Sequence, residues 1–91
     1  MTSSWNFLTN HSHVLLALNR DPDLRQRDIA QLVGITEGAV QRILHDLEQD
    51  GYISRAKVGR RNHYTVNGDL PLRHPLEAHH KVGHLLTSLD A

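Results

Sequence analysis

The chain has 91 residues, enough for one domain and too few for two cores, because folding at this size buries only about 60% of the surface that an unfolded chain exposes. Ten Lys and Arg balance ten Asp and Glu, so net charge supports neither a nucleic-acid nor a membrane partner, and any basic patch has to be local. Cysteine is absent, which excludes disulfide frameworks, thiol catalysis and thiolate metal sites.

A short polar arm, residues 1–8, precedes the first periodic segment. Its beginning lacks the basic residues that open a signal peptide, and the longest apolar run in the chain, residues 14–18, is far below the roughly 20 residues that span a bilayer. We therefore expect a cytoplasmic protein with no membrane partner. Three apolar side chains of the arm are expected to pack on another surface, and these are Trp5, Phe7 and Leu8.

The first helix is predicted to lie between a capping residue and a proline. Thr9 or Asn10 can cap it, because a side-chain oxygen at this position accepts a hydrogen bond from a free amide of the first turn. The apolar positions of one helical face follow, and they are Val14, Leu15 and Leu18. We expect the helix to stop near Asn19, before Asp21 and Pro22.

Two more helices are predicted, joined by about three residues. The second helix has apolar residues at helical spacing, namely Ile29, Leu32 and Val33. It ends at Gly34, because glycine readily adopts the left-handed conformation that terminates helices. Ile35 follows, then Thr36 as the cap of a third helix that Gly51 closes. The apolar positions of this third helix are Val40, Ile43, Leu44 and Leu47.

The remainder of the chain predicts a β-hairpin, a connector and a last helix. Residues 52–58 and 63–66 are β-prone and flank a four-residue tip, residues 59–62. An extended connector follows, and Pro75 suits the first turn of the last helix, where its missing amide is harmless. The apolar face of this helix consists of Val82, Leu85, Leu86 and Leu89.

The two central helices have the features of a helix-turn-helix, within QRDIAQLVGITEGAVQRIL at 26–44. Ala30 is small where the next helix must approach, Gly34 forms the turn, and Ile35 fills the space beneath it. A plain helical hairpin of a bundle is the alternative, and the β-hairpin that follows argues against it. At this point the chain resembles winged-helix transcriptional regulators of the broad MarR and ArsR type, over residues 9–67. The segment LEQDGYISR at 47–55 is similar to their junction between helix and wing.

These features together predict a mainly α fold with a small β-hairpin, a winged helix-turn-helix with a three-helix core, a two-stranded wing and a C-terminal helix. We expect three parts along the chain. Residues 1–8 are the N-terminal arm, residues 9–67 the winged helix-turn-helix domain, and residues 68–91 a connector and C-terminal helix that can serve as a dimerisation element.

The resemblance implies that the helix over 36–50 enters the major groove of DNA and that the wing, 52–66, lies on the flanking backbone or minor groove. Gln41 and Arg42 are the first choices for base recognition, because each type makes bidentate base contacts worth about 1–3 kcal/mol. Gly38 leaves room for a close approach. The wing has four basic residues and no acid between positions 55 and 63. The candidate DNA-binding residues are Arg25, Arg27, Thr36, Glu37, Gln41, Arg42, His45, Arg55, Lys57, Arg60 and Arg61.

Two other interpretations of these charged residues stay open. The polar face of the third helix can be an ordinary solvated surface, and wing charges can protect an edge strand from pairing with other chains. A homodimer on a palindromic site is expected, because one small domain makes few contacts. Its candidate dimerisation residues are Trp5, Phe7, Leu8, Val82, Leu85, Leu86 and Leu89. Packing of the last helix on the chain's own first helix is the alternative.

Metal binding and catalysis find little support in the sequence. His80 and His84 are spaced four apart and Glu77 is near, but a lone pair of this kind is a weak signal, so no metal and no cofactor are predicted. A phosphate-binding glycine loop and an HExxH motif are both absent, so we expect no enzyme. The alternatives to a DNA-binding repressor are a protein-interaction module and a metal-responsive regulator of the ArsR type.

Overall fold

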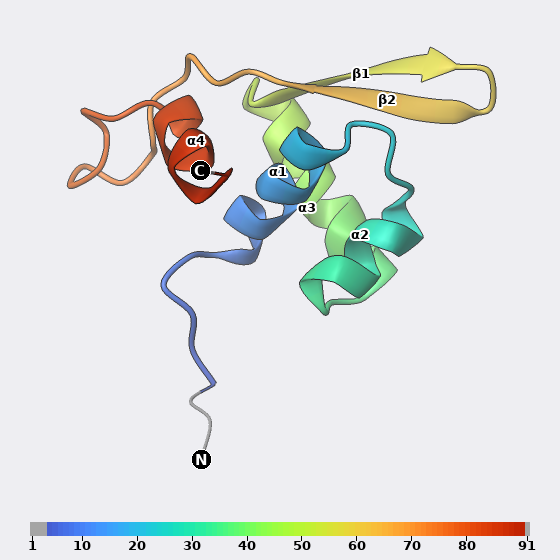
Figure 1. Ribbon diagram of the computed structural model, residues 1–91, viewed down its shortest axis with the longest axis horizontal. Helices are drawn as coiled ribbons and strands as arrows, with labels where there is room; N and C mark the ends of the chain where they lie inside the picture. The colour runs from blue at the N-terminus through green and yellow to red at the C-terminus, as the bar shows by residue number, and fades with distance from the viewer. Residues whose placement is uncertain (1–3, 91) are drawn as a thin grey trace.

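The computed structural model describes residues 4–90, so residues 1–3 of the predicted arm and Ala91 lie outside the described residues. The helices and strands of the described residues follow the order α1 (Asn10–Arg20), α2 (Gln26–Val33), α3 (Glu37–Gln49), β1 (Ile53–Val58), β2 (Arg61–Val66) and α4 (Val82–Asp90). Three helices pack around one core, the hairpin projects from one end, and α4 lies against the opposite side (Figure 1). The predicted mainly α architecture with one hairpin is confirmed. None of the described helices is long and apolar enough to cross a membrane.

Side-chain caps set the beginnings of α1 and α3. Thr9 Oγ1 accepts a hydrogen bond from the Ser12 amide at 3.3 Å, and Thr36 Oγ1 accepts one from the Ala39 amide at 3.1 Å. Each bond satisfies an amide that the first helical turn leaves without a backbone partner. Of the two candidate caps for α1, Thr9 is therefore the one used.

The turn between α2 and α3 has the three residues that were predicted. Gly34 has a φ of 83°, a left-handed conformation that glycine adopts without steric cost. The amides of Gly34 and Ile35 both donate to the carbonyl of Ala30, at 2.8 and 3.1 Å. These bonds bring the chain sharply around, so that α3 starts immediately after α2 ends.

The core lies where α1, α2 and α3 meet. Its most deeply buried side chains are Val14, Leu18, Ile29 and Val40. Ala30 is also buried, at the position where α3 approaches α2. Leu32 was expected on the apolar face of α2, and this was wrong, since 67% of it is exposed. The helix turns 100° per residue, so Leu32 lies about 160° around α2 from Ala30, on the outer flank of Ile29.

The hairpin is tighter than the sequence suggested. Val58 pairs with Arg61, so Gly59 and Arg60 alone form the loop, and the predicted four-residue tip is wrong. Gly59 has a φ of 65°, which permits a two-residue turn whose twist matches that of the strands. Arg61 and Asn62, expected in the tip, therefore belong to β2.

Residues 68–81 fold back on themselves before α4 begins at Val82. The amides of Val82 and Gly83 donate to the carbonyls of Leu70 and Gly68, at 2.8 and 2.9 Å. These bonds hold residues 81–83 beside the connector, so the helix starts at Val82. The predicted start near Pro75 was wrong. A Cβ built on Gly83 would lie 2.9 Å from the Gly68 oxygen, which means that this approach requires glycine.

Helix α4 packs on α1 of the same chain, which was the alternative to packing on a partner. Val82 and Leu86 are 4% and 2% exposed and belong to the common core. Asp90 accepts hydrogen bonds from Arg20 Nε at 2.7 Å and from Asn19 Nδ2 at 3.0 Å. The hydrogen bond from Arg20 holds the pKa of the Asp90 carboxyl below its ordinary value.

Replacing Leu86 by Ala is expected to lower the free energy of unfolding by about 2–5 kcal/mol, because it leaves a cavity under α4. Leu89→Ala is the matched control, since Leu89 is 39% exposed and its loss should cost less than about 1 kcal/mol. Urea unfolding at several protein concentrations measures both values. A Leu86→Ala effect that changes with concentration would show that a second chain, and not α1, covers this helix.

The pair between Arg20 and Asp90 predicts a pH-dependent term in stability. A carboxyl whose pKa is lowered on folding stabilises the fold above its unfolded value of about 3.9, and this stabilisation is lost as the pH falls through the folded pKa. Asp90→Asn should therefore be less stable than the parent at pH 6, and this difference should shrink as the pH falls from about 4 toward 2. Urea titrations across this range test it, and a constant difference between parent and variant would contradict it.

Candidate nucleic-acid interface

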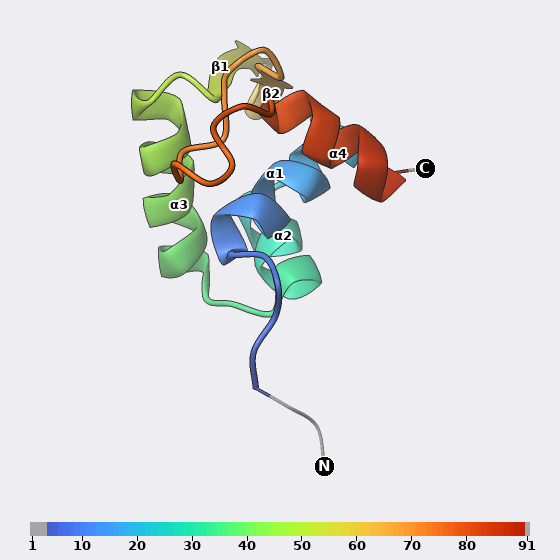
Figure 2. The same cartoon turned by 90° about the vertical axis from the view of Figure 1, so that its left-hand side faces the viewer.

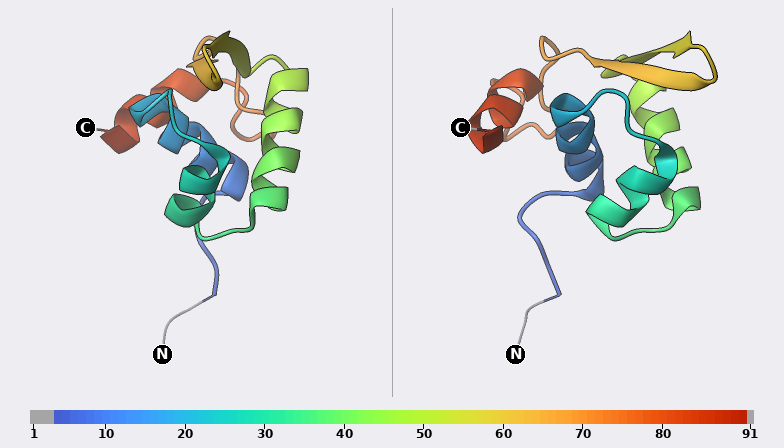
Figure 3. Two further views of the ribbon diagram at one scale, coloured as in Figure 1. Left: turned by 90° about the vertical axis from the view of Figure 1, so that its right-hand side faces the viewer. Right: turned by 45° about the vertical axis from the view of Figure 1, so that its right-hand side comes forward.

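One side of α3 is free of the other helices. The helix lies at an edge of the molecule, with α1 between it and α4 (Figures 2 and 3). Its buried positions form one stripe, made of Val40, Ile43, Leu44 and Leu47. Packing of this stripe on α1 and α2 leaves the opposite side of α3 in contact with solvent.

The exposed side of α3 carries Gly38, Arg42 and His45 opposite the buried stripe, as the rotation of 100° per residue requires. Gln41 is also exposed but lies on the flank that includes Glu48, one residue and about 100° away from Arg42. The two predicted base-reading residues thus face different directions. A Cβ built on Gly38 would meet only Thr36 Oγ1, at 4.0 Å, so the fold itself does not require glycine there.

The first turn of α3 holds the other two candidates on this helix. Thr36 is exposed, and its hydroxyl already accepts the Ala39 amide as the cap. Glu37 is exposed too, and its negative charge is favourable beside the positive end of the helix dipole. Both residues stand at the leading end of the exposed side.

Of the four basic residues of the wing, two bond to other parts of the chain and two are exposed on the hairpin. Arg55 Nε lies 3.5 Å from Glu48 Oε2 of α3, and Arg61 donates to the backbone carbonyl of Asp23 at 3.1 Å. Lys57 lies in β1 and Arg60 in the loop at the tip, and both are exposed. Arg61 was expected at the tip beside Arg60, whereas it points back toward the segment between α1 and α2.

Two further hydrogen bonds tie the wing to the same segment. His63 Nδ1 donates to Asp23 Oδ1 at 2.7 Å, and the Tyr64 amide donates to the Pro22 carbonyl at 2.9 Å. This segment therefore covers the free edge of β2, which limits unwanted pairing of that strand. Sequence reasoning missed these contacts, because nothing in the spacing relates residues that are 40 positions apart.

Arg25 and Arg27 stand at the beginning of α2. Both are exposed, and the Arg25 amide donates to Asp28 Oδ2 at 3.2 Å. Arg27 lies in the first turn, where the helix dipole disfavours a cation and favours an anion. A phosphate beside these residues would satisfy both the guanidinium groups and the free amides of the turn.

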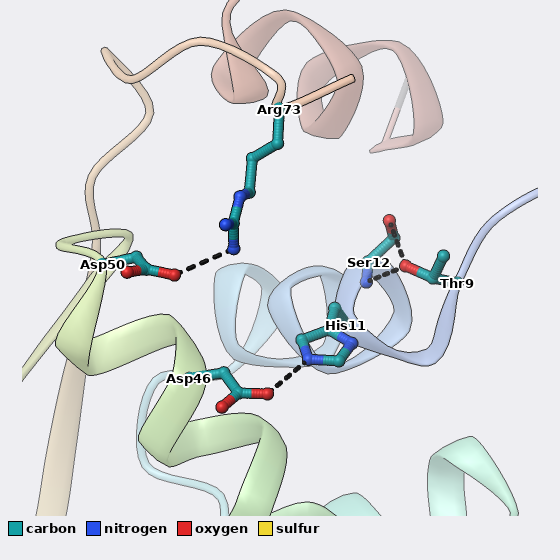
Figure 4. Close-up of polar contacts among 6 residues, drawn as sticks. All are labelled: Thr9, His11, Ser12, Asp46, Asp50 and Arg73. Atoms are coloured by element: carbon teal, nitrogen blue, oxygen red, sulfur yellow. Dashed lines mark hydrogen bonds and ion pairs between the residues drawn. The ribbon is translucent and has the colours of Figure 1, made fainter.

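The carboxyl-terminal half of α3 carries acids that bind other parts of the chain. Asp46 Oδ2 accepts a hydrogen bond from His11 Nε2 of α1 at 2.9 Å, and Asp50 Oδ2 accepts one from Arg73 Nη1 of the connector at 2.8 Å (Figure 4). The His11 hydrogen bond holds the pKa of the Asp46 carboxyl below its ordinary value. These contacts tie the carboxyl-terminal end of α3 to α1 and to the connector.

A cavity of about 380 Å³ lies between these two pairs. Its apolar lining comes from α1, α3, the residue before β1, the connector and α4, and includes Leu15, Leu47, Tyr52, Leu72, Val82 and Leu85. Phe7 and Leu8 of the arm also line it. The sequence did not predict this space, because the connector that closes it was expected to be partly helical.

The predicted dimerisation residues are not one continuous surface. Val82 and Leu86 are buried within the chain itself, so their inclusion was wrong. Trp5 and Phe7 are 65% and 92% exposed, and their rings meet edge to face with centroids 5.0 Å apart. Leu8 and Leu85 are half-buried, and Leu89 is exposed at the end of α4.

The weak metal candidates are arranged differently from the sequence expectation. His80 lies before α4 and not one turn below His84 on the same helix, because the backbone there pairs with the connector. The rings of His80 and His84 have centroids 6.3 Å apart, and Glu77 lies in a turn. Within residues 4–90, no three His, Asp or Glu side chains are grouped as metal ligands.

Residues 5–61 match the MarR family. Two solved structures share the fold, FabT of Streptococcus pneumoniae in complex with DNA and MepR, a transcription regulator of the Staphylococcus aureus multidrug efflux pump MepA. FabT has a TM-score of 0.58 and 23% identity over 71% of this chain and 48% of its own. MepR has a TM-score of 0.59 and 23% identity over 92% of this chain and 58% of its own.

A curated relative is also similar, an uncharacterized protein of Methanocaldococcus jannaschii that is 30% identical over 63 residues. The match covers 68% of this chain and 13% of that protein. The chain thus spans about half the length of the solved regulators and a small part of this relative. The predicted winged helix-turn-helix fold is confirmed by the solved structures.

Proposed function

Because the chain belongs to the MarR family, we propose that it is a sequence-specific double-stranded DNA-binding transcriptional regulator that acts as a repressor. The observation that carries this proposal is the exposed side of α3, which a turn of three residues holds away from the core beside a basic hairpin. A helix presented in this way fits the major groove of B-DNA. FabT, which shares the fold, was solved in complex with DNA.

In this proposal the leading half of α3 reads bases. Arg42 has the geometry for a bidentate contact to guanine and Gln41 for one to adenine. Because they point in different directions, they would contact different base pairs. Thr36, Glu37 and His45 would complete the set, with Thr36 near the backbone and the other two near base edges.

The remaining basic residues would bind the DNA backbone. Arg60 at the exposed tip and Lys57 in β1 supply the wing contacts, while Arg25 and Arg27 supply contacts at the start of α2. Arg55 and Arg61 have partners in the chain, and these exposed bonds are weak enough to be exchanged for phosphate. Phosphate contacts of this kind set the position of the protein on the duplex.

We also propose that the protein acts as a homodimer in the cytoplasm, by binding and not by catalysis. The exposed aromatic pair of Trp5 and Phe7 supports an apolar interface with a second copy, and Leu89, exposed at the end of α4, would add a separate contact. Two-fold symmetry would then demand a palindromic site whose halves lie roughly 34–36 Å apart, or a multiple of this distance. Leu8 and Leu85 are half-buried and can contribute to the same interface.

Arg42→Ala and Arg60→Ala are expected to weaken DNA binding in different ways. Loss of the base contact should reduce discrimination between the best duplex and random duplexes by about 5- to 150-fold, which corresponds to 1–3 kcal/mol. Loss of the wing contact should weaken all duplexes alike and reduce the salt dependence of binding by about one phosphate contact per subunit.

Fluorescence anisotropy across a salt series, with a duplex selected from a random pool, measures both effects. Arg20→Ala serves as the matched control, because Arg20 is exposed on α1 and binds Asp90, away from the proposed interface. The proposal would be contradicted if the parent protein bound selected and random duplexes equally well. An Arg60→Ala variant that binds as tightly as the parent would also contradict it.

Gly38→Ala is expected to separate stability from binding. Alanine in place of a helical glycine should raise the free energy of unfolding by about 1 kcal/mol, since the added methyl group meets nothing closer than 4.0 Å. The same methyl group should weaken duplex binding, because it stands opposite the buried stripe where the helix must approach DNA. Urea unfolding and anisotropy test the two halves, and unchanged DNA affinity would show that Gly38 does not face the duplex.

A further inference from the structure

We infer that His11 is a specificity-determining positioning residue, which occupies the Asp46 carboxylate and thereby leaves Arg42 available to read DNA. The inference rests on the proposed function, and it assigns a role in base recognition to a residue of α1. Its basis is a geometric conflict on α3. Asp46 follows Arg42 by four positions, so the two side chains are neighbours on the helix surface and can form an ion pair.

The three side chains share one place on the molecule. His11, Arg42 and Asp46 line a single shallow hollow, together with Asn10, Ala39 and Ile43. His11 Nε2 lies 2.9 Å from Asp46 Oδ2, and the charge of Arg42 contributes to the lowered pKa of this carboxyl. Asp46 thus has two candidate partners, His11 and Arg42, and the structure records the hydrogen bond to His11 (Figure 4).

Local helix chemistry does not explain why either partner stands where it does. Asp46 lies in the carboxyl-terminal half of α3, toward the end where the helix dipole disfavours an anion, and His11 lies in the first turn of α1, where a protonated imidazole would be disfavoured. The contact between them satisfies both side chains across 35 positions of sequence. Placement against the local preference on both helices points to a role in the tertiary structure.

The neighbouring charged groups leave this competition local to Arg42. On α3, His45 also acts electrostatically on Asp46, and Asp50 is held by Arg73 of the connector. Without His11, Arg42 is the arginine of α3 that stands in the i, i+4 relation to Asp46 and can pair with it. A guanidinium bound to Asp46 must leave it before contacting a base, so discrimination falls by the strength of that pair.

Epistasis between His11, Asp46 and Arg42 tests the inference, with duplexes selected on the parent protein. The readout is the ratio of dissociation constants for random and selected duplexes, which cancels a general change in charge. His11→Ala should lower this ratio about two- to five-fold, the range that an exposed ion pair supplies. Asp46→Ala alone should not lower it, and His11→Ala with Asp46→Ala should restore the parent ratio.

Asp50→Ala is the matched control, because it removes the same charge from the same end of α3 but lies eight positions from Arg42. His11→Ala with Asp50→Ala should keep the reduced ratio. In an Arg42→Ala background, His11→Ala should have no further effect. A purely structural bond would instead make His11→Ala and Asp46→Ala equally damaging, and the double variant no better than either.

The outcomes distinguish the inference from the function on which it rests. A parent protein that selects no duplex overturns the proposed function, and the inference falls with it. A parent that discriminates, together with a double variant that remains impaired, overturns only the role of His11. Persistence of the His11→Ala effect without Arg42 would likewise show that His11 acts through another part of the interface.

Discussion

Burial of one apolar stripe on α3 is the constraint on which the rest of the structure depends. Val40 is fully buried between α1 and α2, and Ile43, Leu44 and Leu47 continue the stripe along the helix. Because a helix has 3.6 residues per turn, fixing this side inward fixes Arg42 and His45 outward. The orientation of the polar side therefore follows from hydrophobic packing, and no polar contact is needed to establish it.

Polar contacts refine this orientation at the far end of the helix. Asp46, Glu48 and Asp50 each bind a basic side chain from a different element, namely α1, β1 and the connector. All three pairs are exposed, so each contributes little to stability. Their common effect is on charge distribution, since each places a basic side chain beside an acid at this end of the helix. A chain with no net charge can nevertheless present a basic wing.

Sequence periodicity predicted the parts of the fold that depend on neighbours in the chain. The caps at Thr9 and Thr36, the left-handed Gly34 and the buried stripe of α3 are local features with strong preferences, and the structure has them as expected. The predicted start of α4 at Pro75 was wrong, because the backbone hydrogen bond from Val82 to Leu70 overrides the preference of proline for a first helical turn. The predicted four-residue tip of the wing was wrong for a related reason, because Arg61 pairs with Val58 and belongs to β2.

The features of the candidate interface also divide into those that depend on neighbours in the chain and those that depend on distant residues. Exposure of Gln41, Arg42 and Arg60 could be predicted from the residues alone, whereas the bonds of His11 and His63 to distant aspartates could not. Those two bonds have a common consequence, because one joins α1 to α3 and the other joins the segment after α1 to the wing. Both elements proposed to contact DNA, α3 and the wing, are thus bonded to α1 or to the segment that follows it. Helix α4 packs on the other side of α1. A change in how α4 packs would therefore reach helix and wing through the same element.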